Sequence, residues 1–386
     1  MKVLWLASWY PNSYEPVNGD FVQRHAQAVA EYLPIDVIHV VQLGKDANVK
    51  PLQVKHEQQQ LNEFIYAFKF KKNGIEWLDK IRYNLAYQHF YKKIIEQYIQ
   101  ENGKPNLIHV HVPMKAGLVA LAFKRKYQIP FIVSEQASYY ESASPDNFNK
   151  RSFFFRKNTQ TIFQQAITAT NVSATIANVI QQKFGLAKVH CVHNVVDVDL
   201  FQFKKNEQKN VFRWVHVSTL GEQKNITGLL EAFAIVKQEC NIQWQLTLVG
   251  PNVQPHISTL QSLQLQEKVF FVGEAKHKDV PNYLQQANAF VLFSRHENFP
   301  CVIPEALCCG LPVVASNVGG VAEAINKTNG IVVASNNIAE LAKAIISVME
   351  NYQQYQQDII SKAAAEKYSM KSIGKQFFSL YQQVLS

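Results

Sequence analysis

Two glutamates, Glu297 and Glu305, are the residues of this sequence whose spacing best suits them to bind a ligand. Prolines around them prevent one continuous helix from carrying both carboxylates. We therefore expect Glu297 on a loop after a buried strand, residues 289–293. Glu305 falls in the first turn of a short helix that we expect to begin at Pro304 and end at Gly310.

The chemistry of the two carboxylates follows from these positions. The positive end of the helix favours the ionised form of Glu305, which suits it to accept hydrogen bonds from a vicinal diol such as a ribose. Glu297, on its loop, could bind the hydroxyls of a second ring. A capping glutamate and a solvated loop glutamate are the alternative interpretation of the two residues taken singly.

The elements that must position these glutamates alternate between strands and helices. In the first half, we expect strands near residues 2–8, 36–41, 64–70, 107–111, 131–134, 166–170 and 189–192, and helices near 21–33, 78–100, 115–127, 150–165 and 174–184. In the second half, we expect strands near 213–219, 244–249, 269–272, 289–293, 313–315 and 331–333, with helices between and after them. Such alternation predicts the α/β class with a doubly wound parallel sheet in each half. We expect a polar loop at residues 45–61 and a linker at residues 204–210.

The segment around the glutamates also resembles a known family signature. Its order is Glu297-x7-Glu305, then Gly310-Leu311-Pro312-Val313-Val314-Ala315, then Gly319-Gly320-x-x-Glu323. This order resembles the donor-site motif of glycosyltransferase family 4, whose members are retaining enzymes with two facing Rossmann-like domains and an interdomain cleft, the GT-B fold. The resemblance implies an acceptor-side domain at residues 1–200, a nucleotide-sugar-binding domain at 201–366, and a helix at 367–386 that crosses back to the first domain. It implies neither a cofactor nor a metal.

The same resemblance assigns roles to residues of the second half. The stretch 217–225 resembles the family's phosphate-binding segment, in which Lys224 would neutralise the donor diphosphate. Thr219 stands where the family usually has an arginine, and Arg295 is a candidate replacement for that arginine. The other donor-site residues that the resemblance implies are Gly250, Glu297, Asn298, Phe299 and Glu305.

Two places in the first half match the family as well. Asn18 and Gly19 end the loop after the first strand, where a glycine lets the backbone approach a ligand and the free amides of a helix start suit a phosphate. His111, on the same face of its strand as His109, resembles a strand-end histidine of the family that would contact the transferred sugar or the acceptor hydroxyl. Glu135 also ends a strand and could face the acceptor. The resemblance implies that His111, Lys224 and Glu297 carry the catalysis, although a strand-end histidine is often only structural.

Composition and charge narrow the class of protein and its partners. The chain has 386 residues, 47% of them hydrophobic, and a net charge of +9. Residues 1–200 hold 23 Lys and Arg against 16 Asp and Glu, whereas residues 201–386 hold 16 against 14. A basic first half favours an acidic lipid, a phosphorylated acceptor or a nucleic acid as partner, but no nucleic-acid motif is present.

The sequence also predicts where the chain works. No signal peptide and no run of about 18 apolar residues appears, which predicts a cytoplasmic protein that can associate with the inner face of the plasma membrane. Five cysteines without a Cys-x-x-Cys pair predict reduced thiols and no zinc site. Two basic and aromatic stretches, residues 148–157 and 78–100, fit either helices at an anionic membrane surface or helices that pack their aromatic side chains into the first domain.

These features predict a metal-independent, retaining glycosyltransferase. It would move a hexose-type sugar from a nucleotide-diphosphate sugar to a saccharide or lipid-linked acceptor, in surface polysaccharide or glycolipid synthesis. The alternatives are a sugar-nucleotide epimerase of the same fold, a glycosidase that uses Glu297 and Glu305, and a basic nucleic-acid or lipid-binding protein without catalysis. A glycosidase is disfavoured because the helix start keeps Glu305 ionised. A dehydrogenase is disfavoured because no Gly-x-Gly-x-x-Gly follows a strand.

Overall fold

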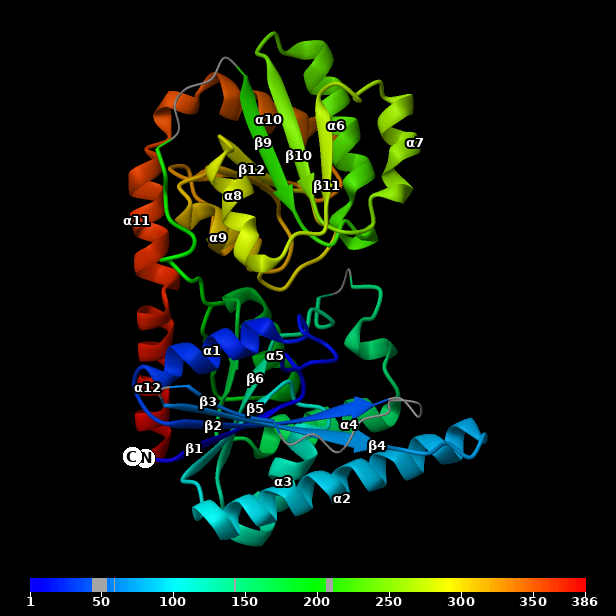
Figure 1. Cartoon of the computed structure of the whole chain (residues 1–386), viewed down its shortest axis with the longest axis vertical. Coiled ribbons are helices and arrows are strands. Elements are labelled where there is room, and N and C mark those ends of the chain that lie inside the picture. The colour runs from blue at the N-terminus through cyan, green and yellow to red at the C-terminus, as the bar shows by residue number, and fades with distance from the viewer. Residues whose placement is uncertain (44–53, 59, 142–143, 206–210) are drawn as a thin grey trace.

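The computed structural model describes residues 1–43, 54–58, 60–141, 144–205 and 211–386. It contains two separate sheets, each with helices packed on its faces, and one domain lies above the other (Figure 1). The predicted α/β class, with two doubly wound domains, is confirmed.

Eight strands form the first sheet, in the order β3-β4-β2-β1-β5-β6-β7-β8. The strands are β1 (Val3–Ala7), β2 (Ile35–Leu43), β3 (Val54–Gln58), β4 (Leu61–Lys69), β5 (Leu107–His111), β6 (Phe131–Glu135), β7 (Ala169–Asn171) and β8 (Val189–Cys191). All pairings are parallel except that of β3 with β4. The chain winds outward on both sides of the β1–β5 pair, so a crevice opens at the carboxyl ends of these two strands.

Helices cover both faces of the first sheet. They are α1 (Asp20–Ala30), α2 (Glu76–Asn102), α3 (Ala116–Tyr127), α4 (Phe153–Gln165) and α5 (Ala174–Phe184), with a 3-10 turn η1 (Phe148–Lys150). Helix α3 packs against both α2 and α4, which places these three helices on one face. Helix α1 packs on the last helix of the chain, on the opposite face.

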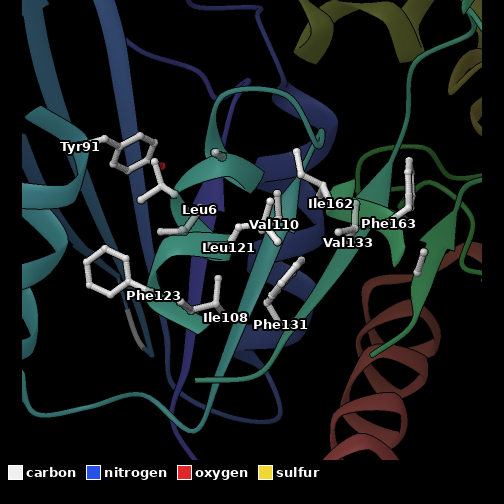
Figure 2. Packing of buried hydrophobic residues seen from close by; sticks show 14 of the residues in the cluster. Leu6, Tyr91, Ile108, Val110, Leu121, Phe123, Phe131, Val133, Ile162 and Phe163 are labelled. Atoms are coloured by element: carbon white, nitrogen blue, oxygen red, sulfur yellow. The ribbon is translucent and has the colours of Figure 1, made fainter. Parts of the chain in front are cut away.

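The alternation of side chains along each strand explains why helices cover both faces of the sheet. All five residues of β1 are buried, as expected for a parallel strand that is covered on both faces. Leu4 and Leu6 enter the core beneath α2, α3 and α4, whereas Val3 and Trp5 enter the core beneath α1. Figure 2 shows the first of these cores, in which strand residues meet side chains of the covering helices, among them Leu6, Tyr91, Ile108, Val110, Leu121, Phe123, Phe131, Val133, Ile162 and Phe163.

Six parallel strands form the second sheet, in the order β11-β10-β9-β12-β13-β14. They are β9 (Phe212–Val217), β10 (Trp244–Val249), β11 (Val269–Gly273), β12 (Ala289–Leu292), β13 (Val313–Ser316) and β14 (Gly330–Val333). The helices are α6 (Ile226–Glu239), α7 (Gln254–Ser262), α8 (Val280–Gln285), α9 (Val302–Cys308) and α10 (Ile338–Glu350), with 3-10 turns η2 (Glu222–Lys224), η3 (His277–Asp279), η4 (Val321–Glu323) and η5 (Tyr352–Gln354).

The last two helices connect the domains. Helix α11 (Gln357–Tyr368) packs on α9 of the second domain, and α12 (Met370–Leu385) packs on α1 of the first. Figure 1 shows them running along one side of the molecule, from the second domain to the first. A side chain at Gly374 would lie 2.0 Å from the carbonyl oxygen of Ala28, so glycine is what allows α12 to lie this close to α1.

Three local predictions were wrong. Strand β3 occupies part of the loop predicted at residues 45–61, because its backbone pairs antiparallel with the edge strand β4; residues 44–53 and 59 lie outside the described residues. Helix α9 begins at Val302 rather than at Pro304. Pro304 still fits in the first turn, because the amides of a first turn have no acceptor within the helix and the N–H that proline lacks is not needed there. The helix expected from residue 150 is divided, since Ser152 caps α4 by accepting a hydrogen bond from the Phe155 amide. Most of the predicted linker, residues 206–210, lies outside the described residues.

Among the described residues, no helix combines the length and apolar character that crossing a membrane requires.

Candidate active site

The second sheet changes winding direction between β9 and β12, and the loops that follow these strands carry the first part of the site. In doubly wound sheets a ligand crevice opens at such a switch point. The loop after β9 brings Lys224 to this crevice, and the loop after β12 brings Glu297. The Lys224 ammonium donates a hydrogen bond to Glu297 Oε1, and both side chains are largely buried. A cation and a carboxylate therefore share the position where a diphosphate and a sugar would meet.

Hydrogen bonds to neighbouring groups fix the Glu297 loop. Ser294 Oγ donates to Glu297 Oε1 over 2.7 Å. The amide of Arg295 donates to the Gln223 carbonyl over 2.8 Å, and the Gln223 side chain donates to the His296 carbonyl over 2.7 Å. These bonds tie the loops after β9 and β12 together, so the ion pair sits on a preorganised support.

Two main-chain amides beside Glu297 bind a carboxylate from the first domain. Glu141 accepts the N–H of Glu297 and the N–H of Gly319, each over 3.0 Å. Gly319 has a φ of 52°, and a side chain there would lie 2.0 Å from the Glu297 carbonyl oxygen. Glycine is thus required for the loops after β12 and β13 to approach. Partial burial raises the pKa of Glu141, although the two amides oppose that shift.

Glu305 lies in the first turn of α9, as predicted, and is buried. Its Oε1 atom is 2.8 Å from Nε2 of His277 and 3.6 Å from Nη1 of Arg24, a residue of α1. Arg24 Nη2 also lies 3.4 Å from Sγ of Cys301, just before α9. The carboxylate expected to bind a ribose is therefore in contact with a cation of the opposite domain.

A cavity of 280 Å³ lies between the domains beside these residues. It is lined by residues of both domains: Trp9, Phe21, Gln136, Ala137, Ser138, Val172, Asn194, Gln223, Glu297, Asn298, Phe299, Pro300 and Cys301. A larger cavity of 460 Å³ lies beside α11 and shares no lining residue with the first. We assign the site to the smaller cavity because it contains Glu297 and lies at the strand ends.

The remaining donor-side candidates lie around the same loops. Thr219 is exposed and its carbonyl accepts a hydrogen bond from Asn252. A side chain at Gly250 would lie 1.8 Å from the Ser218 carbonyl oxygen, so this glycine is needed for the loops after β9 and β10 to pack. Arg295 is exposed and its guanidinium donates to Asn225 and Asn336, which directs it away from the Lys224–Glu297 pair.

Asn298 and Phe299 contact the first domain rather than standing free in the cleft. The Asn298 amide donates to the Gln136 carbonyl over 3.1 Å. The Phe299 ring stacks on His193 with 4.6 Å between the ring centroids, and its carbonyl accepts a hydrogen bond from Asn194 over 2.7 Å. Both residues also line the interdomain cavity.

The glycine-bearing loop of the first domain has the expected form at its end. Gly19 precedes α1 with a φ of 76°, and a side chain there would lie 2.5 Å from the Trp9 carbonyl carbon. Asn18 closes the preceding turn through a 2.8 Å hydrogen bond to the Glu15 carboxylate. The Phe21 amide donates to the Asp20 carboxylate over 2.8 Å and the Val22 amide to the Gly19 carbonyl over 2.9 Å, so these first amides of α1 are already paired.

His111 is fully buried in the core of the first domain. Its ring stacks on Trp5 with 3.9 Å between the centroids, and neither ring nitrogen has a hydrogen-bond partner among the described residues. Burial, together with the nearby His109 and His25, lowers the pKa of His111 well below its ordinary value, so the ring is neutral. His111 does not line the interdomain cavity.

Glu135 is also buried and serves the loop that follows it. Its carboxylate accepts the amides of Gln136 and Ala137 and the hydroxyls of Tyr139 and Tyr140, over 2.8 to 2.9 Å. Burial raises the pKa of Glu135 despite these four donors. The carboxylate therefore shapes the loop that lines the cavity, and its role toward an acceptor stays a prediction.

One group of three possible metal ligands occurs among the described residues: Cys191, His193 and Glu323, whose ligand atoms lie within 4.8 Å of one another. The sequence did not indicate this group, because its members come from two domains. Glu323 already accepts the first amides of α5, from Ala174 and Thr175, over 2.8 Å each. That bond makes Glu323 an interdomain helix cap.

Sequence reasoning missed two side chains that reach across the cleft, Arg24 and Glu141. Arg24 follows Gly19 by five positions, on the turn of α1 that faces the second domain. Glu141 follows the loop that Glu135 organises. Neither lies in a motif of the second domain, and only the packing of the two domains places them at the site.

Comparisons with known proteins agree with this geometry. A family described as Glycosyl transferases group 1 matches residues 197–366, and one described as Glycosyltransferase Family 4 matches residues 22–200. The putative teichuronic acid biosynthesis glycosyltransferase TuaC of Bacillus subtilis is 24% identical over 368 residues, which cover 89% of this chain and 88% of that protein. N-acetyl-alpha-D-glucosaminyl L-malate synthase of Bacillus anthracis is 23% identical over 236 residues, 58% of this chain and 61% of that protein.

Two solved structures share the fold. Sucrose-phosphate synthase of Thermosynechococcus elongatus superimposes with a TM-score of 0.76 at 18% identity, covering 100% of this chain and 99% of that one. HepE of Anabaena, solved in complex with UDP, superimposes with a TM-score of 0.74 at 19% identity, covering 99% of this chain and 100% of that one. At these identities the likeness shows the GT-B fold, including its two facing domains.

Proposed function

We propose that the chain is a GT-B glycosyltransferase of the family 4 type, and that it transfers a hexose-type sugar from a nucleotide-diphosphate sugar to a saccharide or lipid-linked acceptor, with retention of configuration. The observation that carries this proposal is the Lys224–Glu297 pair at the switch point of the second sheet, with Glu305 in the first turn of α9 nearby. The proposed pathway is surface polysaccharide or glycolipid synthesis, in keeping with the relative that is named for teichuronic acid biosynthesis.

In the proposed reaction, the bond between the anomeric carbon and the diphosphate oxygen breaks, and a bond from that carbon to the acceptor oxygen forms on the same face. The acceptor proton passes to the departing diphosphate. Lys224 neutralises the charge that develops on this leaving group, which is the main electrostatic task of the step. We propose that no metal takes part, since Lys224 supplies positive potential at the leaving group.

Glu297 and Glu305 hold the donor through its hydroxyls in this proposal. An ionised carboxylate accepts two hydrogen bonds, which matches a pair of neighbouring hydroxyls. In this structure Glu297 pairs with Lys224, and Glu305 pairs with Arg24. On donor binding, the two carboxylates would instead accept hydrogen bonds from sugar and ribose hydroxyls, and the two cations would bind diphosphate oxygens. Closure of the domains would keep water from the activated donor.

The test of this function is a thermal-shift screen with UDP-, GDP- and ADP-sugars. One donor class should raise the unfolding temperature, by linkage to binding, and should be consumed only when an acceptor is added. The variant Lys224→Ala should lose the shift. Absence of a shift with all three classes would contradict the proposal, and conversion of the donor sugar without an acceptor would show an epimerase instead.

For the acceptor we propose a lipid-linked saccharide at an anionic membrane surface, because the first domain exposes apolar side chains where α2 and α4 begin. Trp77, Ile81 and Leu85 recur every four residues on α2, and the Trp77 side chain is 65% exposed. Phe153 and Phe154 are exposed in the first turn of α4. Figure 1 shows the N-terminal end of α2 extending beyond the rest of its domain.

The charges beside the phenylalanines of α4 complement anionic lipid, whereas Glu76 and Asp79 offset the two cations beside the apolar stripe of α2. Lys80 and Arg82 flank the apolar stripe of α2, and exposed Arg156 and Lys157 follow the phenylalanines of α4. No Asp or Glu occurs from residue 147 to residue 196, a stretch that holds six Lys and Arg. Both helices begin at the carboxyl edge of the first sheet, the edge that also forms the cleft, so a lipid-anchored acceptor at this surface would lie near the donor.

Vesicle co-sedimentation tests the membrane contact independently of catalysis. The protein should bind vesicles that contain phosphatidylglycerol, and a variant with serine at positions 77, 81 and 85 should bind at least about tenfold more weakly, since each apolar side chain contributes about 1.5 to 3 kcal/mol when buried. A matched control places serine at the exposed Phe270 and Ile359 of the second domain and should bind normally. Equal binding of all three proteins would refute this surface.

A further inference from the structure

The donor site of the second domain has few cations for the charge it is proposed to bind. A nucleoside diphosphate carries at least two negative charges, and Lys224 is already paired with Glu297. Position 219, where the family has an arginine, is an exposed threonine. Arg295, the candidate replacement, donates its hydrogen bonds to the side chains of Asn225 and Asn336. A second phosphate-binding cation must therefore come from elsewhere.

Arg24 is the cation that the first domain places at this site. Its side chain is 11% exposed, and its Nη1 atom lies 3.6 Å from the Glu305 carboxylate. Its Nη2 atom lies 3.4 Å from Sγ of Cys301, and Asp20, one turn earlier on α1, holds the guanidinium at 3.3 Å. Arg24 thus reaches from the start of α1 to the start of α9, across the interdomain cleft.

Not every N–H group of the Arg24 guanidinium has a hydrogen-bond partner among the described residues. Its Nε atom is buried and has no partner among the described residues. Its Nη1 atom lies 2.9 Å from Nε2 of His277, the same nitrogen that lies 2.8 Å from Glu305. One imidazole nitrogen cannot accept from Arg24 and donate to Glu305 at once. A buried donor without an acceptor costs free energy, which an anionic oxygen would remove.

We propose that Arg24 is a donor-binding residue that contacts the diphosphate from the opposite domain and replaces the arginine missing at position 219. This inference rests on the proposed function. When the ribose takes the Glu305 carboxylate, Arg24 is released from that carboxylate and its fork of N–H groups binds phosphate oxygens. Asp20 holds the guanidinium beside the first turn of α1.

This arrangement makes the contact dependent on domain closure. Lys224, Glu297 and Glu305 all belong to the second domain, whereas Arg24 belongs to the first. A diphosphate that bridges them would favour the closed arrangement, in which the acceptor-side domain completes the site. Contact between Arg24 and the diphosphate would then couple donor binding to the position of the first domain.

Calorimetric titration with UDP, GDP and ADP, and with the matching nucleosides, tests this role. With the diphosphate that binds most tightly, Arg24→Ala should weaken binding at least about tenfold, the size expected for a charge-assisted hydrogen bond, and Arg24→Lys should lose less because it keeps the charge. The matching nucleoside should bind Arg24→Ala as tightly as the unaltered protein, or more tightly, because Glu305 is then free. Arg125→Ala, at an exposed position on α3, is the control and should bind both ligands normally.

The outcomes separate this role from the alternatives. An equal loss of affinity for the diphosphate and the nucleoside would show that Arg24 only supports Glu305 and would overturn the proposal, as would unchanged diphosphate binding in Arg24→Ala. If Arg24→Ala fails to fold, the nucleoside comparison with Arg24→Lys decides in the same way. Failure of the unaltered protein to bind any of the three diphosphates would overturn the proposed function together with this inference.

Discussion

The two sheets share a winding pattern, yet the candidate site residues lie within the strand ends of the first sheet and on the loops beyond the strands of the second. In the first sheet, His111 and Glu135 are the last residues of β5 and β6 and are fully buried. In the second sheet, Lys224 and Glu297 lie several residues beyond β9 and β12, and Glu297 lines the interdomain cavity. A polar residue inside a strand end points into the core that covers the sheet, whereas one on the following loop reaches the cleft.

The covering helix α12 strengthens this difference. Tyr381 of α12 approaches Nδ1 of His109 to 2.6 Å, and Ser134 approaches the other nitrogen of that ring to 2.7 Å. Phe377 of α12 packs edge to face against Trp5, on which His111 stacks. The histidines of β5 are therefore part of a buried network beneath α12. The strands at the switch point of the second sheet are also covered on both faces, so the loops beyond those strands are what reach the cleft.

The largest effect should come from a substitution in the cleft loops of the second domain. Lys224→Ala should lower the rate of sugar transfer by about 100-fold, because removing one preorganised electrostatic donor typically costs 10² to 10³ in turnover. The unfolding temperature should also fall, because the buried Glu297 carboxylate loses its ion-pair partner. Single-turnover kinetics with excess enzyme would measure the loss in the chemical step. A near-normal rate in this variant would refute the assignment of the site.

A second prediction uses pH to compare the two cores. Burial lowers the pKa of His25 to about 4, so between pH 6.5 and 4 the unfolded chain binds a proton that the folded chain excludes. Stability is therefore complete above pH 6.5 and falls as the pH decreases, by about 2 kcal/mol at pH 5 for His25 alone. Burial also lowers the pKa of His39, His109 and His111 in the first domain. Among the described residues of the second domain, one fully buried histidine, His216, has a lowered pKa.

Acid should consequently destabilise the first domain more than the second. Hydrogen exchange measured by domain at pH 7 and pH 5 would detect this difference. The variant His25→Gln should show a weaker pH dependence in the first domain. Equal loss of protection in both domains would contradict the prediction.

A smaller effect should come from the network beneath α12. Tyr381→Phe removes the hydroxyl at His109 and leaves a buried ring nitrogen without a partner, which should lower the free energy of unfolding by about 1 kcal/mol. Nucleotide affinity should stay the same, because Tyr381 is far in the fold from the cleft loops. Urea denaturation and nucleotide titration on the same variant would measure both quantities, and a selective loss of nucleotide affinity would show that the network does reach the cleft.

The smallest effect should come from Arg295. Its exposed guanidinium donates to the buried Asn225 and to the exposed Asn336, and substitutions at exposed positions usually change stability by less than about 0.5 kcal/mol. Arg295→Ala should therefore leave the donor affinity within about twofold of normal. A loss as large as that predicted for Arg24→Ala would show that Arg295 is the missing phosphate-binding arginine after all.

Much of the fold could be predicted because its signals are local. The apolar runs before Glu297 and at the start of the chain are buried strands, and Gly310 ends α9 with a φ of 80°. Strand β3 could not be predicted, because its polar residues become a strand only by pairing with β4. The assignment of donor-binding roles to Lys224, Glu297 and Glu305 stays a prediction, although the structure brings the first two into contact.

The sequence by itself determined the order of strands and helices and the positions of the charged loops, since periodicity and helix ends depend on neighbouring residues. Only the tertiary structure decided which strand-end groups are covered and which reach the cleft. His109 meets Tyr381, and Arg24 meets Glu305, across more than 270 positions of the chain. Such contacts depend on how the two domains and the last helix pack, and no local pattern of residues encodes that packing.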